Sequence, residues 1–198
     1  AKASFGTVNL YAKDIFVVMG TGYVHIYTGN GKGKTTAAFG LAVRALCAGK
    51  SVFIGQFVKS MKYNETRLCD LLAGYLNEDG FGRICIEQFG NGCLFDRKPV
   101  QVDIEAAEIG LCECTEKFSS GKWDVVILDE LTVAIYLGLL TEDAVLSALR
   151  MRHPAVEVVI TGRYASQKLI DIADLVTDMQ EVKHYYTKGV LSRDGIDR

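Results

Sequence analysis

Residues 28–36, with the sequence TGNGKGKTT, constrain the fold more than any other part of the chain. They place glycines, lysines and hydroxyl side chains between an apolar run at 23–27 and an alanine-rich helical pattern at 37–48. Glycines allow successive backbone N–H groups to turn toward one anion, and a following helix adds the positive end of its dipole. A strand, loop and helix of this composition predict a phosphate-binding loop in an α/β domain.

The phosphate-loop template G-x-x-x-x-G-K-[ST] is matched at its end by Gly33, Lys34 and Thr35, while Thr28 stands in place of its first glycine. In such loops the lysine contacts phosphate and the hydroxyl contacts Mg²⁺. We therefore expect ATP to contact nine consecutive residues: Thr28, Gly29, Asn30, Gly31, Lys32, Gly33, Lys34, Thr35 and Thr36. A glycine-rich turn that binds nothing is the alternative, and it leaves Lys34 and Thr35 unexplained.

A second motif consists of four apolar residues, 125–128, followed by Asp129 and Glu130. A continuous apolar run is typical of a parallel strand buried on both faces, and ligands bind beyond the carboxyl ends of such strands. With the phosphate loop upstream, Asp129 is predicted to hold Mg²⁺ directly or through water, with Glu130 assisting. The predicted metal ligands are Thr35, Asp129 and Glu130, and the predicted catalytic residues are Lys34, Thr35 and Glu130. A solvated strand end is the alternative.

For two arginines the sequence leaves two roles open. Arg44 lies nine residues beyond Thr35, and it either faces solvent or points back across the nucleotide site. Arg163 follows an apolar run at 156–160. It either contacts phosphate or nucleotide, or it is a surface cation beside the next helix.

Strand and helix patterns alternate along the rest of the chain, which predicts one mainly parallel sheet with helices on both faces. The expected strands are 51–57, 83–89, 156–160, 174–177 and 181–184. The expected helices are 62–79, one running from Pro99 to Phe118, and one from Thr141 to Arg150 and Arg152. We interpret residues 23–198 as a single P-loop NTPase domain of RecA-like type, with 1–22 as an N-terminal extension of uncertain role. The polar segment 188–198 is expected to be a mobile or ligand-ordered tail.

Composition restricts the class of protein further. The chain has 198 residues, of which 49% are apolar, enough for one domain with a buried core. Its formal net charge of −2 argues against a general nucleic-acid binder. No apolar run approaches the roughly 20 residues that cross a bilayer. We expect no membrane partner and a cytoplasmic location.

The six cysteines are scattered without the C-x-x-C spacing of zinc sites. Reduced and mostly buried thiols are therefore expected, rather than a metal or disulfide role. Cys112 and Cys114 are two residues apart on a predicted helix, so their side chains should point in different directions.

From about residue 23 to residue 196 the chain resembles the P-loop type of ATP:corrinoid adenosyltransferase from the cobalamin pathway. Seven segments carry the resemblance: TGNGKGKTTAAFGLAVRA at 28–45, QFVK at 56–59, VILDE at 126–130, VVITGRYA at 158–165, ADLVTDM at 173–179, VKH at 182–184 and GI at 195–196. The loop of this family is spelled like TGNGKGKTT, with threonine where the general template has its first glycine.

The resemblance implies a transferase acting in cobalamin biosynthesis or salvage. In that reaction cobalt(I) of a corrinoid attacks the 5′ carbon of ATP and triphosphate leaves. Because cobalt(I) is the nucleophile, the protein needs no catalytic triad and must supply positioning, charge neutralisation and a dry pocket. The resemblance also implies corrinoid contacts at Phe57 and at Phe95, which stands where tryptophan is usual. If the nucleotide is oriented on the loop differently than in an ordinary ATPase, Arg44 would lie on the adenosine side.

The partners implied by the resemblance are the corrinoid substrate, an external one-electron reductant of flavoprotein type and a second copy in a homodimer. Two other functions remain open on the residues alone. A RecA-like ATPase would hydrolyse ATP to drive conformational change and would need Glu130 to orient water. A regulator would bind nucleotide without turnover.

Overall fold

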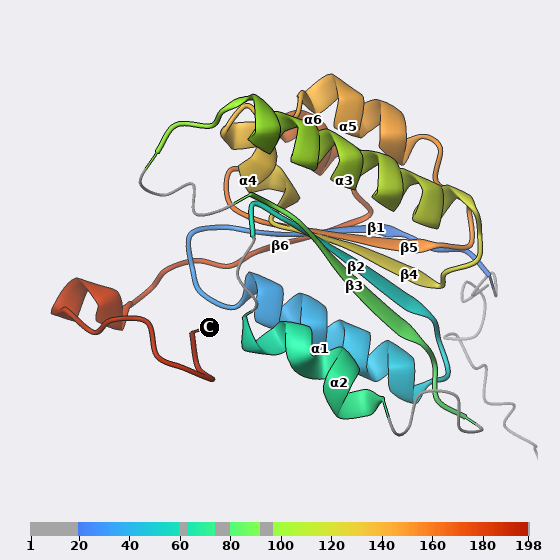
Figure 1. Cartoon of the computed structure of the whole chain (residues 1–198), viewed down its shortest axis with the longest axis horizontal. Coiled ribbons are helices and arrows are strands. Elements are labelled where there is room, and N and C mark those ends of the chain that lie inside the picture. The colour runs from blue at the N-terminus through green and yellow to red at the C-terminus, as the bar shows by residue number, and fades with distance from the viewer. Residues whose placement is uncertain (1–19, 60–62, 74–79, 92–96, 198) are drawn as a thin grey trace, which may run out of the picture.

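Six parallel strands form the centre of the molecule, with helices on both faces (Figure 1). The computed structural model describes residues 20–59, 63–73, 80–91 and 97–197. The strands are β1 (Val24–Thr28), β2 (Val52–Phe57), β3 (Ile84–Phe89), β4 (Val125–Asp129), β5 (Glu157–Thr161) and β6 (Leu175–Asp178). They lie in the order β3-β2-β4-β5-β1-β6, so β5 separates β1 from β4. The predicted single α/β domain with a parallel sheet is confirmed.

The helices divide between the two faces of the sheet. On one face lie α3 (Gln101–Ser119), α4 (Leu131–Tyr136), α5 (Glu142–Leu149) and α6 (Gln167–Ile172), and on the other lie α1 (Lys34–Cys47) and α2 (Leu68–Leu72). All five residues of β4 are buried. Val126 and Leu128 belong to the core under α3 and α5, whereas Val125 and Ile127 belong to the core under α1. The continuous apolar run is therefore explained by a strand that is covered on both faces.

The helix after the phosphate loop begins at Lys34, three residues before the expected start at 37. Gly33 is its N-cap with φ of 117°, and Gly33 O accepts a hydrogen bond from Ala37 N at 2.7 Å. Thr35 and Thr36 therefore lie in the first helical turn. A glycine tolerates this left-handed turn, which allows the chain to enter the helix directly from the loop.

Two expected elements are wrong as stated. Residues 181–184 form no strand among the described parts of the sheet, because His184 instead caps η2 (Tyr185–Lys188) by accepting from Tyr186 N at 3.0 Å. The single helix expected over 62–79 is replaced by η1 (Asn64–Arg67) and α2, and residues 62 and 74–79 lie outside the described chain.

Two helix boundaries also differ from expectation, and one further helix was not expected. Pro99 lies before α3 rather than in its first turn, because Val100 is the N-cap. The start of α5 is confirmed, since Thr141 Oγ1 accepts from Ala144 N at 3.2 Å, but this helix ends at Leu149. Helix α4 was not expected, because its sequence LTVAIY has the β-branched composition of a strand.

The cysteines are less buried than expected. Among the described ones, only Cys114 is buried, whereas Cys47 and Cys112 are exposed and Cys69 and Cys85 are half-buried. The expectation of mostly buried thiols is wrong, because four of the five described cysteines are exposed or half-buried. The different directions expected for Cys112 and Cys114 are confirmed, since Cys112 is exposed and Cys114 is buried.

Trp123 lies just before β4, at the amino edge of the sheet. Its ring packs edge-on against the ring of Phe53, with 5.6 Å between centroids, and the Arg83 guanidinium lies 4.4 Å from its ring centre. The phosphate loop follows β1 and therefore lies at the opposite, carboxyl edge (Figure 1). Within the described residues, no helix is long and apolar enough to cross a membrane.

Candidate active site

The loop at residues 29–33 joins β1 to α1 at the carboxyl edge of the sheet. Gly29 and Gly33 have φ of 95° and 117°, a conformation that glycine adopts readily. Gly31 N donates to Met179 O at 2.7 Å, and a Cβ on Gly31 would lie 2.7 Å from the same oxygen. The chain leaving β6 therefore packs directly against the loop.

Lys34 lies inside this loop. Its Nζ donates to the carbonyl oxygens of Gly29 and Gly31, both at 2.7 Å, and the residue is 7% exposed. Burial lowers the pKa of Lys34, an effect that the Glu130 carboxylate opposes and the Arg163 guanidinium reinforces. The ammonium is thus located where the phosphates of a nucleotide are expected.

Asp129, at the end of β4, is fully buried and accepts from four donors. Its Oδ1 accepts from Thr35 Oγ1 at 2.9 Å and from Thr161 Oγ1 at 2.7 Å. Its Oδ2 accepts from Gln56 Nε2 at 3.0 Å and from Lys59 Nζ at 2.8 Å. These donors come from α1, β5, β2 and the segment after β2. Asp129 therefore connects the phosphate loop to the ends of the neighbouring strands.

Glu130 follows in a left-handed backbone conformation, with φ of 61° and ψ of 21°. Its backbone N donates to Thr161 Oγ1 at 2.9 Å. Burial raises the pKa of Glu130, and the neighbouring Asp129 charge adds to the rise, while the cations of Lys59, Lys34 and Arg163 oppose it. The sharp turn separates the two carboxylates, with Asp129 inside the strand ends and Glu130 only half-buried.

Three residues of this cluster had no role assigned from the sequence: Gln56, Lys59 and Thr161. The available signal was their position at the carboxyl ends of buried strands, which is the criterion that found Asp129. Burial alone would lower the pKa of Lys59, but the hydrogen bond and attraction to Asp129, together with the charges of Glu65 and Glu130, outweigh it and the pKa is raised. The sequence motif at 56–59 therefore contains two direct partners of Asp129.

The two arginines lie in different surroundings. Gly162 has φ of 135°, and a Cβ there would overlap the hydroxyl of Thr132. Arg163 follows this close contact and acts electrostatically on the loop, as its effect on Lys34 shows. Arg44 is exposed on α1, and there it opposes the rise in the pKa of Tyr27 caused mainly by burial. Arg163 thus acts on the pKa values of Lys34 and Glu130, whereas Arg44 acts on that of Tyr27.

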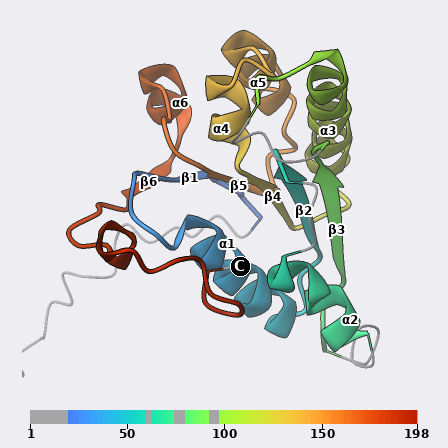
Figure 2. The same ribbon diagram turned by 60° about the vertical axis from the view of Figure 1, so that its left-hand side comes forward.

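Lys32 contacts the C-terminal tail rather than the interior of the loop. Its Nζ donates to Ile196 O at 2.7 Å and lies 3.6 Å from Asp197 Oδ1. Asn64 of η1 donates to Asp194 Oδ1 at 2.8 Å. Figure 2 shows the C-terminal segment returning beside α1. The tail therefore connects the phosphate loop with η1.

The remaining predicted site residues have mixed positions. Asn30 and Thr36 are exposed at the loop and at the first turn of α1. Phe57 is fully buried, with its ring centroid 5.9 Å from that of Phe89. Its predicted corrinoid contact stays a prediction, as does that of Phe95, which lies outside the described residues.

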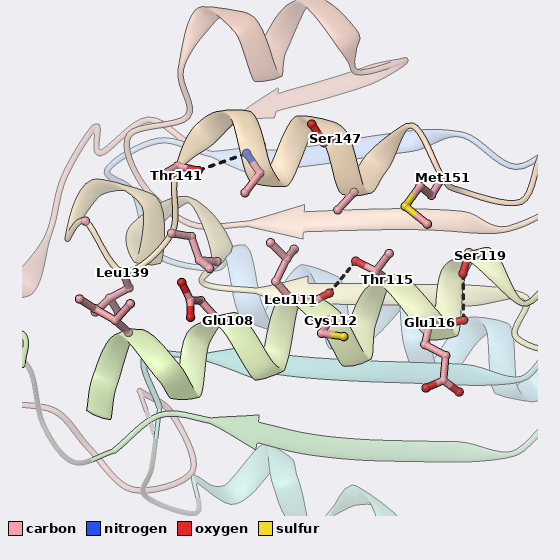
Figure 3. Close-up of a pocket in the computed structure, with 15 residues that line it drawn as sticks. Glu108, Leu111, Cys112, Thr115, Glu116, Ser119, Leu139, Thr141, Ser147 and Met151 are labelled. Atoms are coloured by element: carbon pink, nitrogen blue, oxygen red, sulfur yellow. Dashed lines mark hydrogen bonds between the residues drawn. The ribbon is translucent and has the colours of Figure 1, made fainter. Parts of the chain in front are cut away.

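A cavity of about 660 Å³ lies between α3 and α5 on the other side of the sheet from α1 (Figure 3). Its lining is mainly apolar and includes Leu111, Leu139 and Met151. None of the residues that line it belongs to the loop or to the Asp129 cluster. The candidate active site is therefore the carboxyl edge of the sheet and not this cavity.

Comparison with known proteins identifies the relatives of this chain. The family model described as ATP:corrinoid adenosyltransferase BtuR/CobO/CobP matches residues 20–197. The chain belongs to this family. It is 35% identical to the corrinoid adenosyltransferase CobA of Salmonella typhimurium and 34% identical to the corrinoid adenosyltransferase of Escherichia coli K12. Each comparison covers 89% of this chain and 85% of the relative.

A corrinoid adenosyltransferase of Pseudomonas aeruginosa is 33% identical over 89% of this chain and 83% of its own length. The resemblance stated from the sequence motifs is therefore confirmed. The members of this family are transferases. The part of the chain that the family model matches includes both the phosphate loop and the carboxylates at the end of β4.

Proposed function

We propose that this protein transfers the 5′-deoxyadenosyl group of ATP to cobalt(I) of a corrinoid. The cobalt electron pair forms the new bond to the 5′ carbon, while the carbon–oxygen bond to triphosphate breaks and its electrons leave with the triphosphate. Cobalt is thereby oxidised formally from the +1 to the +3 state. Membership of the adenosyltransferase family supports this reaction for the chain.

The observation that carries the proposal is the 2.9 Å hydrogen bond between Thr35 and Asp129. It joins the end of the phosphate loop to the carboxylate after β4, although 94 residues separate them in the sequence. A hydroxyl and a carboxylate in this arrangement are oxygen ligands of the kind that a hard divalent cation takes. We propose Thr35, Asp129 and Glu130 as the residues that hold Mg²⁺, which would supply positive charge to the leaving triphosphate.

The protein's own groups would position and neutralise the leaving group. We propose that Lys34 and the N–H groups of the loop contact triphosphate, because the ammonium already lies among the loop carbonyls. Arg163 is proposed as a further phosphate contact, and Arg44 as a contact on the adenosine side. A nucleotide complex in which Arg44 lies far from every ligand atom would remove the last assignment.

The corrinoid side of the proposal rests on aromatic residues. Phe95 is proposed to exclude water from the lower face of cobalt. Phe57, whose side chain is buried against Phe89, is proposed as a second corrinoid contact. We further propose an external one-electron reductant of flavoprotein type, a homodimer, and a cytoplasmic role in cobalamin biosynthesis or salvage that involves neither nucleic acid nor membrane.

One experiment tests the proposed reaction. The protein is incubated anaerobically with ATP, Mg²⁺ and chemically reduced cobalamin or cobinamide. Formation of a light-sensitive cobalt–carbon bond together with triphosphate is expected, and Lys34→Met should lower the rate by about two orders of magnitude. Release of ADP and phosphate without corrinoid would instead indicate an ATPase, and bound ATP without either product would indicate a regulator.

A further inference from the structure

The surroundings of Lys59 differ from those of an ordinary surface lysine. Its Nζ lies 2.8 Å from Asp129 Oδ2 and 3.3 Å from Glu65 Oε1, and its side chain is only 15% exposed. The ammonium also lies 5.4 Å from the centre of the Tyr63 ring. A cation between two carboxylates and an aromatic ring is attracted by each of them, which gives Lys59 a defined position.

Two features constrain the backbone next to Lys59. Val58 has φ of 64°, which is unfavourable for a β-branched residue. A Cβ on Gly90 would lie 2.5 Å from the carbonyl oxygen of Lys59, so the end of β3 packs against this backbone. Strain of this kind persists where the surrounding structure requires one conformation. Both features fix the direction in which the Lys59 side chain leaves the sheet edge.

Lys59 occupies an acceptor position on the carboxylate that the proposed function assigns to a divalent cation. A carboxylate has about four such positions, and the four donors to Asp129 fill them. A divalent cation that reached Asp129 Oδ2 would be close to the ammonium, and like charges at such separation repel strongly in a partly buried site. Glu65 offers the Lys59 ammonium a second acceptor, which the side chain reaches without movement of the backbone.

We propose that Lys59 is a positioning residue that holds the place of the divalent cation at Asp129 until nucleotide arrives, and that it then shifts to Glu65. This inference rests on the proposed function, since it takes Asp129 as part of the metal site. It implies that the protein without nucleotide binds divalent cations weakly. Triphosphate would bring the negative charge that offsets the Lys59 ammonium, so metal and nucleotide would enter together.

Binding of Mn²⁺, with the free ion measured by electron paramagnetic resonance, tests this inference without any turnover. Mn²⁺ prefers the same oxygen ligands as Mg²⁺. Lys59→Met removes the charge and keeps the length of the side chain. We expect the affinity for Mn²⁺ without nucleotide to rise on the order of tenfold in this variant. The gain should disappear in a variant that also carries Asp129→Asn.

Glu65→Gln provides a test in the opposite direction. It removes the carboxylate that shares the Lys59 ammonium with Asp129, so the affinity for Mn²⁺ should fall several-fold. Lys50→Met is the matched control, because Lys50 precedes β2 at the amino edge, where its Nζ lies 3.9 Å from Asp124 Oδ1. It should bind Mn²⁺ like the unaltered protein.

The outcomes separate this inference from the proposed function. An unchanged or lower affinity in a folded Lys59→Met variant would overturn the inference. If that variant does not fold, an unchanged or higher affinity in Glu65→Gln would overturn it instead. Tight Mn²⁺ binding with ATP, together with an affinity without nucleotide that neither variant changes, would reject the inference and leave the proposed function standing. Failure of the unaltered protein to bind Mn²⁺ with ATP would reject both.

Discussion

At the scale of single residues, Thr161 connects two parts of the site with one hydroxyl. Its Oγ1 donates to Asp129 Oδ1 at 2.7 Å and accepts from Glu130 N at 2.9 Å. The residue is fully buried at the end of β5. The same group therefore orients the Asp129 carboxylate and satisfies the first N–H of the turn into α4.

Replacing this hydroxyl by a methyl group should leave Glu130 N without its partner. We expect Thr161→Val to lower the free energy of unfolding by about 1–3 kcal/mol, as measured by urea denaturation. Thr115→Val is the matched control, since the Thr115 hydroxyl only donates to Leu111 O within α3. The control should change stability by no more than about 0.5 kcal/mol. Equal losses in both variants would contradict the role given to Thr161.

The sequence predicts some of these residues and not others for a physical reason. Lys34 and Thr35 belong to one short continuous motif, and Asp129 follows an unmistakable buried strand. Thr161 and Lys59 contact Asp129 only because β5 and β2 are the neighbours of β4 in the sheet. That order is set by packing of the whole domain and is not encoded in any local spacing.

At the scale of elements, the phosphate loop depends on the chain that leaves β6. Gly31 N donates to Met179 O, and Met179 N donates to Thr28 O at 2.9 Å. The edge strand thus supports the loop from outside the β1–α1 unit. This contact makes Gly31 a position where size matters, although its φ lies outside the left-handed region.

We expect Gly31→Ala to weaken ATP binding by at least about tenfold, because the added Cβ would lie 2.7 Å from Met179 O and displace the loop. Equilibrium titration with ATP measures this. Gly40→Ala in α1 is the control, since nothing lies within 4 Å of a Cβ there. It should bind ATP normally and gain up to about 1 kcal/mol of stability from better helix propensity. Normal ATP binding by Gly31→Ala would show that the loop adapts.

The start of α3 depends on Asp103, which is buried. Its Oδ2 accepts from Val100 N at 2.8 Å, and its Oδ1 accepts from the Arg97 guanidinium at 2.7 Å. Hydrogen bonding to Arg97 lowers the pKa of Asp103 from 3.8 to about 2, against the opposing effect of burial. The stabilisation is therefore present above pH 3.8 and is lost as the pH falls toward about 2.

Asp103→Asn should accordingly be less stable than the unaltered protein near pH 7. The difference in free energy of unfolding should shrink once the pH falls below about 4, because the unaltered carboxyl then begins to lose its charge. Denaturation at several pH values gives both curves. Asp143→Asn, at an exposed carboxylate in the first turn of α5, should show a smaller difference. A gap for Asp103→Asn that stays constant down to about pH 2 would refute the assignment.

Element types were predicted best where a buried pattern was long or continuous. Strands β2 and β4 and helix α3 were expected from such patterns. Helix α4 was missed because its residues prefer strands, yet Leu131 and Ala134 are fully buried beneath it. Tertiary packing decides against the local preference of α4. Residues 181–184 were expected to form a strand, but Val182 is their only β-branched residue and it is exposed, and the sheet of the described residues ends at β6.

At the scale of the whole molecule, unusual backbone conformations gather at one edge. Among the described residues, the non-glycine positions with positive φ are Val58, Glu130 and Tyr164. They follow strands β2, β4 and β5, which are neighbours in the sheet. Strained backbone collects where ligands are positioned, so this edge carries the constraints that the rest of the fold supports.

The C-terminal tail closes the same edge from outside. Asp197 accepts from Arg193 Nε at 3.1 Å and from the Tyr185 hydroxyl, and it lies beside Lys32. We expect Asp197→Ala to speed amide hydrogen exchange in residues 185–197 at least about tenfold, with the exchange of β2 and β4 unchanged. Mass spectrometry of peptic fragments measures both regions. Equal acceleration in the strands would mean that the tail contributes to global stability.

Trp123 has a practical consequence for all of these measurements. It is the only tryptophan in the chain, and it lies at the amino edge of the sheet between Phe53 and Arg83. Its intrinsic fluorescence should therefore report loss of the folded core while remaining insensitive to nucleotide at the opposite edge. A change in emission on adding ATP would signal that the two edges communicate through the sheet. If the emission does not change on adding ATP, the fluorescence of Trp123 can follow unfolding with or without ligand.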